Sequence, residues 1–187
     1  MTLFKKVLRL FLCFYLLISL MLIVTAAAFG GKWNSAALYH NSSNNVYSSQ
    51  VNTAATAWNN FLSHGSSGIR LGQAPAVTAT ITVSSGFYGL HTFVAYGQPG
   101  PNPNSGFYSY GTIWFNRSYT QDFESDKPAL IQALAAHETG HILGLEHIKT
   151  SQISIMHVNI ASNYGSPGWT FSSPLMFDRA NLLSIYP

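Results

Sequence analysis

Three histidines and a glutamate lie within eleven residues of this chain, at a spacing that suits metal-dependent hydrolysis. Residues 137 to 147 read His-Glu-Thr-Gly-His-Ile-Leu-Gly-Leu-Glu-His. His137 and His141 are four residues apart, so in a helix their imidazoles lie one turn above the other on a single face. Two nitrogens in that position can bind one Zn²⁺ at about 2.0–2.1 Å. The pair therefore predicts half of a zinc site.

The third ligand is predicted at His147, which a straight helix would carry away from the metal. Gly144 has no β-carbon, so it can adopt a positive φ, end the helix and turn the chain back. His147 then reaches the metal from the other side. Three protein ligands leave the fourth position of the zinc open to water, which is typical of a catalytic rather than a structural site.

Glu138 follows the first ligand and is rotated from it by about 100° around the helix. It would therefore lie beside the metal and not bind it. In that position we expect Glu138 to take the proton of the zinc-activated water and pass it to the leaving amine. The metal would polarise the scissile carbonyl and stabilise the oxyanion.

The elements that position these residues follow from the pattern of apolar residues. The ligand-bearing helix is predicted over 128–144, with Asp126 as its cap and Pro128 in its first turn. A second helix, over 46–62, precedes it in the chain, and a third closes the chain at 174–185. Strands are expected at 35–39, 69–71, 77–83, 91–96 and 111–116, and loops at 98–105 and 148–172. This order predicts an α+β fold.

The histidine pattern resembles the signature of the metzincin clan of metalloproteases. Ser154-Ile155-Met156 follows, with the methionine nine residues after His147, and this short spacing resembles the matrixins. Astacins share the Ser-Ile-Met-His sequence. However, they have a metal-binding tyrosine where this chain has Val158, and an acid where it has Ile148, so the astacin resemblance is weaker.

The matrixin resemblance extends over essentially the whole of residues 29–187 and implies a catalytic domain. It implies a twisted mixed sheet of about five strands, with an active-site helix, a second helix nearer the N-terminus and a C-terminal helix. The activity implied is that of a zinc-dependent endopeptidase. Its protein or peptide substrate would lie along the edge strand near 91–96, and the loop over 157–171 would wall the pocket for the residue after the cut. Asp178, at a matching acidic position, is expected to accept structural hydrogen bonds.

The chain departs from animal matrixins in ways that affect its metals. Those proteins block their zinc with a propeptide cysteine, whereas the one cysteine here is Cys13. They also hold a second zinc and calcium through acids and histidines before the active-site helix. This chain has no Asp or Glu from Phe29 to Gln121. We therefore expect one zinc and no calcium in that region, and we interpret His157 as a loop histidine bonded to backbone.

The first 28 residues have the order of a secretory signal peptide. Three basic residues precede a run of fifteen almost entirely apolar residues, over 10–24, and Ala26-Ala27-Ala28 offers a cleavage site before Phe29. Cleavage would give a secreted protein. The alternative is an uncleaved anchor that holds the domain outside the membrane, since no charge occurs between Leu10 and Gly31.

The charge balance argues against a nucleic-acid partner. The formal net charge is +3, but three of the nine Lys and Arg residues precede residue 29, which leaves six against six acids. We expect a monomer without membrane contact unless the leader is retained. The alternative function, from another class, is a secreted zinc-binding recognition or adhesion domain without turnover. The intact Glu138 favours the enzyme.

Overall fold

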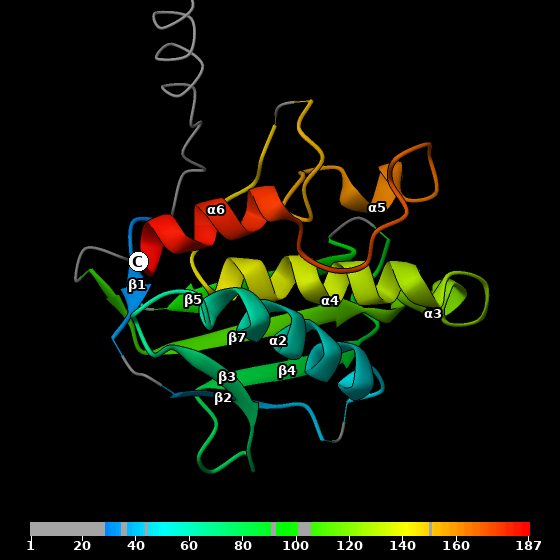
Figure 1. Ribbon diagram of the computed structural model, residues 1–187. Coiled ribbons are helices and arrows are strands. Elements are labelled where there is room, and N and C mark those ends of the chain that lie inside the picture. Colours follow the sequence, from blue (N-terminus) through cyan, green and yellow to red (C-terminus); the bar gives the residue numbers. More distant parts are fainter. Residues whose placement is uncertain (1–28, 35–36, 44, 91–92, 101–105, 150) are drawn as a thin grey trace, which may run out of the picture.

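The computed structural model describes residues 29–34, 37–43, 45–90, 93–100, 106–149 and 151–187 (Figure 1). The predicted leader at 1–28 lies outside the described residues. The strands are β1 (Lys32–Trp33), β2 (Ala37–Asn41), β3 (Arg70–Gln73), β4 (Ile81–Gly86), β5 (Ala95–Gly100), β6 (Phe107–Tyr108) and β7 (Tyr110–Asn116). The helices are α2 (Ser48–Leu62), α3 (Arg117–Asp126), α4 (Pro128–Ile142), α5 (Ile160–Asn163) and α6 (Met176–Ile185). Among the described residues, no helix has the length and apolar character needed to cross a membrane.

Five strands form one mixed sheet in the order β3-β2-β4-β7-β5. β2 pairs in parallel with β3 and β4, and β4 pairs in parallel with β7, whereas β5 runs antiparallel to β7. β5 is therefore an edge strand with one side of its backbone unpaired within the sheet. β1 and β6 form a separate parallel pair. The predicted α+β fold with a five-stranded mixed sheet is confirmed.

Helices α2 and α4 pack side by side against one face of this sheet (Figure 1). The buried residues of α2 recur at helical spacing and form one apolar stripe, as predicted: Val51, Ala54, Ala55, Trp58 and Leu62. The indole N–H of Trp58 donates to the Ala136 carbonyl at 2.8 Å, which joins the two helices beneath the site. From the sheet, Ile113 and Phe115 of β7 are buried on the same side.

Two strands begin later than predicted. Alternation of Val and Thr predicted a strand over 77–83, but Val77 is 91% exposed and the Thr78 N–H closes a turn on the Pro75 carbonyl at 3.0 Å. The edge strand predicted over 91–96 begins at Ala95, and His91 lies outside the described residues. It continues through Pro99, which was assigned to a loop, because an edge strand tolerates a residue without an N–H.

Two helices were missed and one cap was wrong. α3 begins after Asn116, whose side chain caps it by accepting from the Ser118 N–H at 3.0 Å. The short α5 lies within the predicted loop over 148–172. α3 runs to Asp126, so the cap of α4 is Lys127 and not Asp126, although Pro128 occupies the first turn as predicted.

Candidate metal centre

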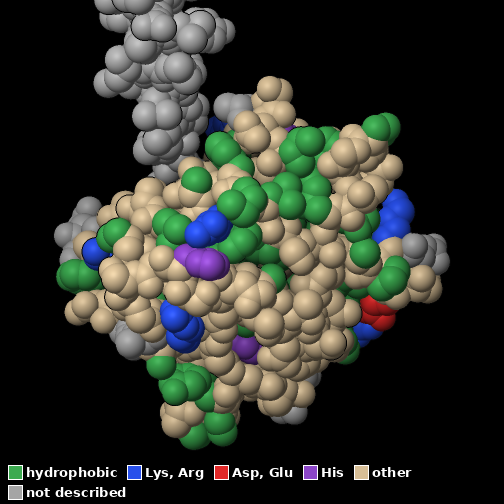
Figure 2. Space-filling view, in the orientation of Figure 1, with side chains coloured by type: hydrophobic (Ala, Val, Ile, Leu, Met, Phe, Trp, Pro, Cys, Tyr) green, Lys and Arg blue, Asp and Glu red, His purple; other side chains and the backbone are tan. Residues whose placement is uncertain are grey.

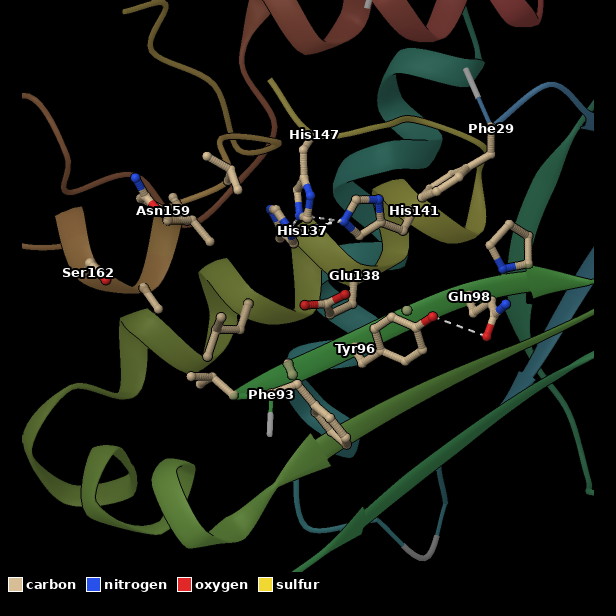
Figure 3. Close-up of a pocket in the computed structure, with 18 of the residues that line it drawn as sticks. Phe29, Phe93, Tyr96, Gln98, His137, Glu138, His141, His147, Asn159 and Ser162 are labelled. Atoms are coloured by element: carbon tan, nitrogen blue, oxygen red, sulfur yellow. Dashed lines mark hydrogen bonds between the residues drawn. The ribbon is translucent and has the colours of Figure 1, made fainter. Parts of the chain in front are cut away.

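The three predicted histidine ligands converge on one point at the end of α4. His137 and His141 project from the helix and are each 4% exposed, whereas His147, in the segment that follows, is exposed. Their Nε2 atoms lie 3.1–3.2 Å from one another (Figure 3). Among the described residues, this is the one group of three or more His, Cys, Asp or Glu side chains placed to hold an ion.

Backbone carbonyls fix the tautomers of the two helical ligands. Nδ1 of His137 lies 2.6 Å from the Ile155 carbonyl, and Nδ1 of His141 lies 2.7 Å from the Leu145 carbonyl. A carbonyl can only accept, so each Nδ1 carries the proton and each Nε2 presents a lone pair. A hydrogen bond donated by the ring nitrogen that does not face the metal is the usual way in which metal-binding histidines are oriented.

This donor set fits a tetrahedral zinc ion. A hydrogen bond does not explain the approach of His137 and His141, because both of their Nε2 atoms are unprotonated and neither can donate. A tetrahedral ion with bonds of about 2.0–2.1 Å separates its ligand nitrogens by about 3.3 Å. The observed separations of 3.1–3.2 Å come close to that value. His137, His141 and His147 could therefore hold the metal together.

Burial lowers the pKa of all three histidines. It places the pKa of His137 well below its ordinary value, with His141 adding to the effect. It lowers the pKa of His141 to about 4, although the bond to Leu145 acts in the opposite direction. Burial, and secondly Lys149, lower the pKa of His147. Because neutral imidazole is the form that binds metals, the site is ready to bind at neutral pH.

Gly144 makes the turn that the third ligand requires, with φ at +96°. Its N–H donates to the His141 carbonyl at 2.9 Å, and the Leu145 N–H donates to the Gly140 carbonyl at 3.0 Å. These two bonds form a Schellman motif, which ends α4 and reverses the chain. The predicted role of Gly144 is confirmed.

Met156 lies beneath the ligands, as predicted for the turn at Ser154-Ile155-Met156. It is 1% exposed, and a β-carbon at Gly140 would lie 2.3 Å from its Sδ atom. α4 therefore needs a glycine between its two histidines, because the methionine occupies that space. The same turn supplies the Ile155 carbonyl that holds His137, so it both supports and orients the ligand set.

Asp178, at the start of α6, holds this turn in place. Its buried carboxylate accepts hydrogen bonds from the Ser154 hydroxyl, from the Ile155 N–H at 3.1 Å and from the Leu175 N–H at 2.7 Å. Burial raises its pKa, although these hydrogen bonds oppose the effect. The expected structural role of Asp178 is confirmed. Ile155 links it to His137, because its N–H donates to Asp178 and its carbonyl accepts from the His137 ring.

Glu138 points into the space between α4 and β5, beside the histidines and not among them (Figure 3). It is 4% exposed, and burial raises its pKa to about 8, while a hydrogen bond from the Gly97 N–H acts in the opposite direction. A β-carbon at Gly97 would lie 2.5 Å from the Glu138 carbonyl oxygen. The edge strand therefore approaches the helix this closely only because residue 97 is glycine.

A family model described as matrixin matches residues 39–167, more than half of the chain, and this range includes all three histidines. The chain belongs to the matrixin family. It is therefore a zinc metallopeptidase, a hydrolase that acts on protein or peptide substrates. No curated protein matches the sequence.

The cleft of this matrixin has a volume of about 630 Å³ and lies between α4, β5 and the segment that includes α5. Residues 93–99 line one side and residues 158–162 line part of the other. Of the strand predicted near 91–96, the described residues 93–96 line the cleft, together with 97–99 beyond it, and of the loop predicted over 157–171, residues 158–162 line it. Among the described lining residues, Glu138 is the sole Asp, Glu, Lys or Arg. Charged side chains are also sparse on the face shown in Figure 2.

Of the other histidines, the three that the structure describes, His40, His64 and His157, do not join the metal cluster. Nδ1 of His157 lies 3.1 Å from the Asn159 N–H, and its ring packs edge-on against Trp169 with centroids 4.7 Å apart. The interpretation of His157 as a loop histidine bonded to backbone is confirmed. Nδ1 of His40 lies 3.2 Å from the Ser42 hydroxyl in a buried position, and His64 is exposed.

Sequence reasoning missed two contacts in the site. Gly97 carried no motif, and its role arises from a helix and a strand that meet only in the folded chain. Phe29 was considered only as the residue after the leader, yet it lines the cleft and contacts His141. The sequence did contain a signal for the role of Phe29, because this large aromatic residue is the first residue of the predicted mature chain.

Proposed function

We propose that this matrixin is a secreted endopeptidase that binds one zinc through His137, His141 and His147 and uses Glu138 as its general base. The convergence of three neutral imidazoles beside a buried carboxylate, in a cleft along a free strand edge, carries this proposal. The residues that hold the metal are thus separate from the residue that moves the proton.

His137, His141 and His147 would hold the zinc, which would supply Lewis-acid activation of the scissile carbonyl and a nucleophilic water at neutral pH. The Glu138 carboxylate then accepts a proton at Oε and returns it to the leaving nitrogen. Burial raises the pKa of Glu138, and a bound zinc ion beside it would favour the ionised form and oppose this effect. The Gly97 N–H favours the same form and fixes the direction of the carboxylate.

The substrate binds as an extended strand along β5. The side of β5 that does not pair with β7 faces the cleft, so a peptide there can add to the sheet through backbone hydrogen bonds. The residue after the cut then enters the end of the cleft bordered by Val158, Asn159 and Ile160. Because Glu138 is the sole formally charged side chain among the described lining residues, the cleft favours uncharged, apolar peptide segments.

The leader directs the protein out of the cell. Its basic start, apolar run and alanine triplet support export with cleavage before Phe29, and an uncleaved anchor would still place the domain outside the membrane. We further propose that the protein is a monomer, that it holds one zinc, and that it binds no calcium in the region from Phe29 to Gln121. The absence of Asp and Glu from Phe29 to Gln121 supports the last point, because calcium prefers carboxylate ligands.

The experiment that tests this function incubates the purified protein with a diverse peptide mixture, with and without a zinc chelator, and measures its metal content. We expect about one zinc per chain, cleavage within peptides, and loss of cleavage on chelation with recovery when zinc is restored. A protein that holds zinc firmly but cleaves no peptide would instead be the recognition domain considered from the sequence. Two tightly held zinc ions would contradict the single site.

A further inference from the structure

The first described residues, 29–34, form an N-terminal arm that lies against the metal centre. The Phe29 N–H donates to the Gly144 carbonyl at 3.0 Å, and the indole N–H of Trp33 donates to the Ile142 carbonyl at 2.7 Å. Between them, β1 pairs with β6. The arm is thus fixed at both ends to the turn that joins His141 to His147.

The side chain of Phe29 lies between this turn and the cleft. Its ring meets the ring of His141 edge-on, with centroids 5.4 Å apart and planes at 62°. It remains 38% exposed and borders the cleft. In Figure 3 it lies on the His141 side of the site, whereas Asn159 and Ser162 lie on the far side of His137 and His147. The cleft therefore has two ends, and Phe29 is at the end opposite to residues 158–162.

We propose that Phe29 contacts the substrate and gives this peptidase a preference for a large apolar side chain on the N-terminal side of the scissile bond. The proposal rests on the proposed function, in which the residue after the cut lies at the 158–162 end. A substrate in that direction extends its preceding residues past His141 to Phe29. Gln98 lies toward this end in Figure 3, and Tyr108 lies beside Gly144 in the turn that Phe29 contacts; both line the cleft and neither is charged.

The physical basis of the preference is the burial of apolar surface. The exposed part of Phe29 is removed from water when a large aliphatic or aromatic side chain of the substrate packs on its ring, and this burial favours binding. An alanine, a glycine or a charged residue at the same substrate position buries little apolar surface, so it gains little binding free energy. The ring is already held by its backbone hydrogen bond and by His141, so little conformational freedom is lost on binding. Discrimination therefore comes from a preformed surface.

The test compares Phe29→Ala and Phe29→Leu with the parent and with Phe107→Ala, all made in the full chain. Phe107 is a suitable control because it belongs to β6, which pairs with the arm, is 44% exposed and does not border the cleft. Intact mass establishes that the compared proteins share one N-terminus, and zinc content is measured for each. The substrates are peptide pairs that differ only in leucine or alanine at each of the first three positions before the cut.

The readout is the ratio of kcat/KM between the two members of each pair, which does not depend on the fraction of active enzyme. For the parent we expect a preference for leucine of about tenfold at one of these positions. Phe29→Ala should reduce it to about twofold or less through KM, while Phe29→Leu and Phe107→Ala should retain most of it. A parent without this preference, or a Phe29→Ala variant that keeps it, would overturn the proposal. A parent that cleaves none of the peptides would instead contradict the proposed function itself.

Discussion

Replacing Asp178 tests whether α6 controls the metal centre through the turn at Ser154-Ile155-Met156. One carboxylate oxygen, Oδ2, accepts from the backbone N–H groups of Ile155 and Leu175, and the other, Oδ1, accepts from the Ser154 hydroxyl. The Ile155 carbonyl in turn holds Nδ1 of His137. Asp178→Ala removes all three acceptor contacts. Asp178→Asn can keep its oxygen at the Oδ2 position and donate its amide N–H to the Ser154 oxygen.

The two variants should therefore differ in magnitude. In Asp178→Ala, the buried Ile155 N–H loses its acceptor at about 1–3 kcal/mol and the partly buried Leu175 N–H at about 1 kcal/mol, so the free energy of unfolding should fall by about 2–4 kcal/mol. That is a large part of the roughly 5–15 kcal/mol available to a domain. Asp178→Asn keeps its hydrogen-bond partners but loses the negative charge that strengthens these bonds, so the free energy of unfolding should fall by only about 1–2 kcal/mol. Loss of an outer partner of a ligand typically weakens metal binding by about 10- to 100-fold.

The assay combines urea unfolding of the metal-free proteins with zinc competition against a chelator of known affinity, at a temperature where circular dichroism shows each variant folded. We expect zinc affinity to fall by about 10- to 100-fold in Asp178→Ala and by less than about threefold in Asp178→Asn. A folded Asp178→Ala variant with the zinc affinity of the parent would refute the link to His137. Equal losses in both variants would show that the charge matters, and not the arrangement of acceptors.

Two further outcomes are expected. Gly97→Ala should lower kcat/KM by at least about tenfold with zinc retained, because the new methyl group displaces β5 from Glu138. In the control variant Gly72→Ala, the new methyl group would meet only a tyrosine ring at 3.4 Å, so kcat/KM should change by less than about twofold. Equal effects of the two substitutions would contradict the contact between Gly97 and Glu138. Burial lowers the pKa of His40 below 6.5, so its contribution to stability is complete above pH 6.5 and is lost as the pH falls toward the folded-state pKa. The urea midpoint of metal-free His40→Gln should therefore fall less between pH 7 and pH 5 than that of the parent, and an equal fall would contradict this assignment.

The convergence of the three histidines could be predicted because it depends on local structure. His137 and His141 are placed by the helical repeat, and His147 by one glycine whose positive φ is a property of its residue type. The apolar stripe of α2 was predictable for a similar reason, since it depends on a short pattern of residues. These features survive folding because tertiary contacts reinforce the local preference.

The features that could not be predicted depend on contacts between distant segments. The start of β4 is set by the Pro75 turn and by pairing with β7, which outweigh the Val and Thr alternation around Val77. Pro99 extends β5 because its position at the edge leaves the missing N–H without consequence. Gly97 and Phe29 acquire their roles only when β5 and the N-terminal arm reach α4 and the turn that follows it.

The most direct test of the central claim, that metal binding and proton transfer belong to different residues, is zinc content and peptide cleavage measured together in Glu138→Gln, His141→Ala and the parent. Glu138→Gln should keep about one zinc, because its three imidazoles are intact. Its turnover should fall by at least about two orders of magnitude, because it has lost the base. His141→Ala should lose zinc and activity together. If Glu138→Gln lost its zinc, or kept its turnover, this division of roles would be wrong.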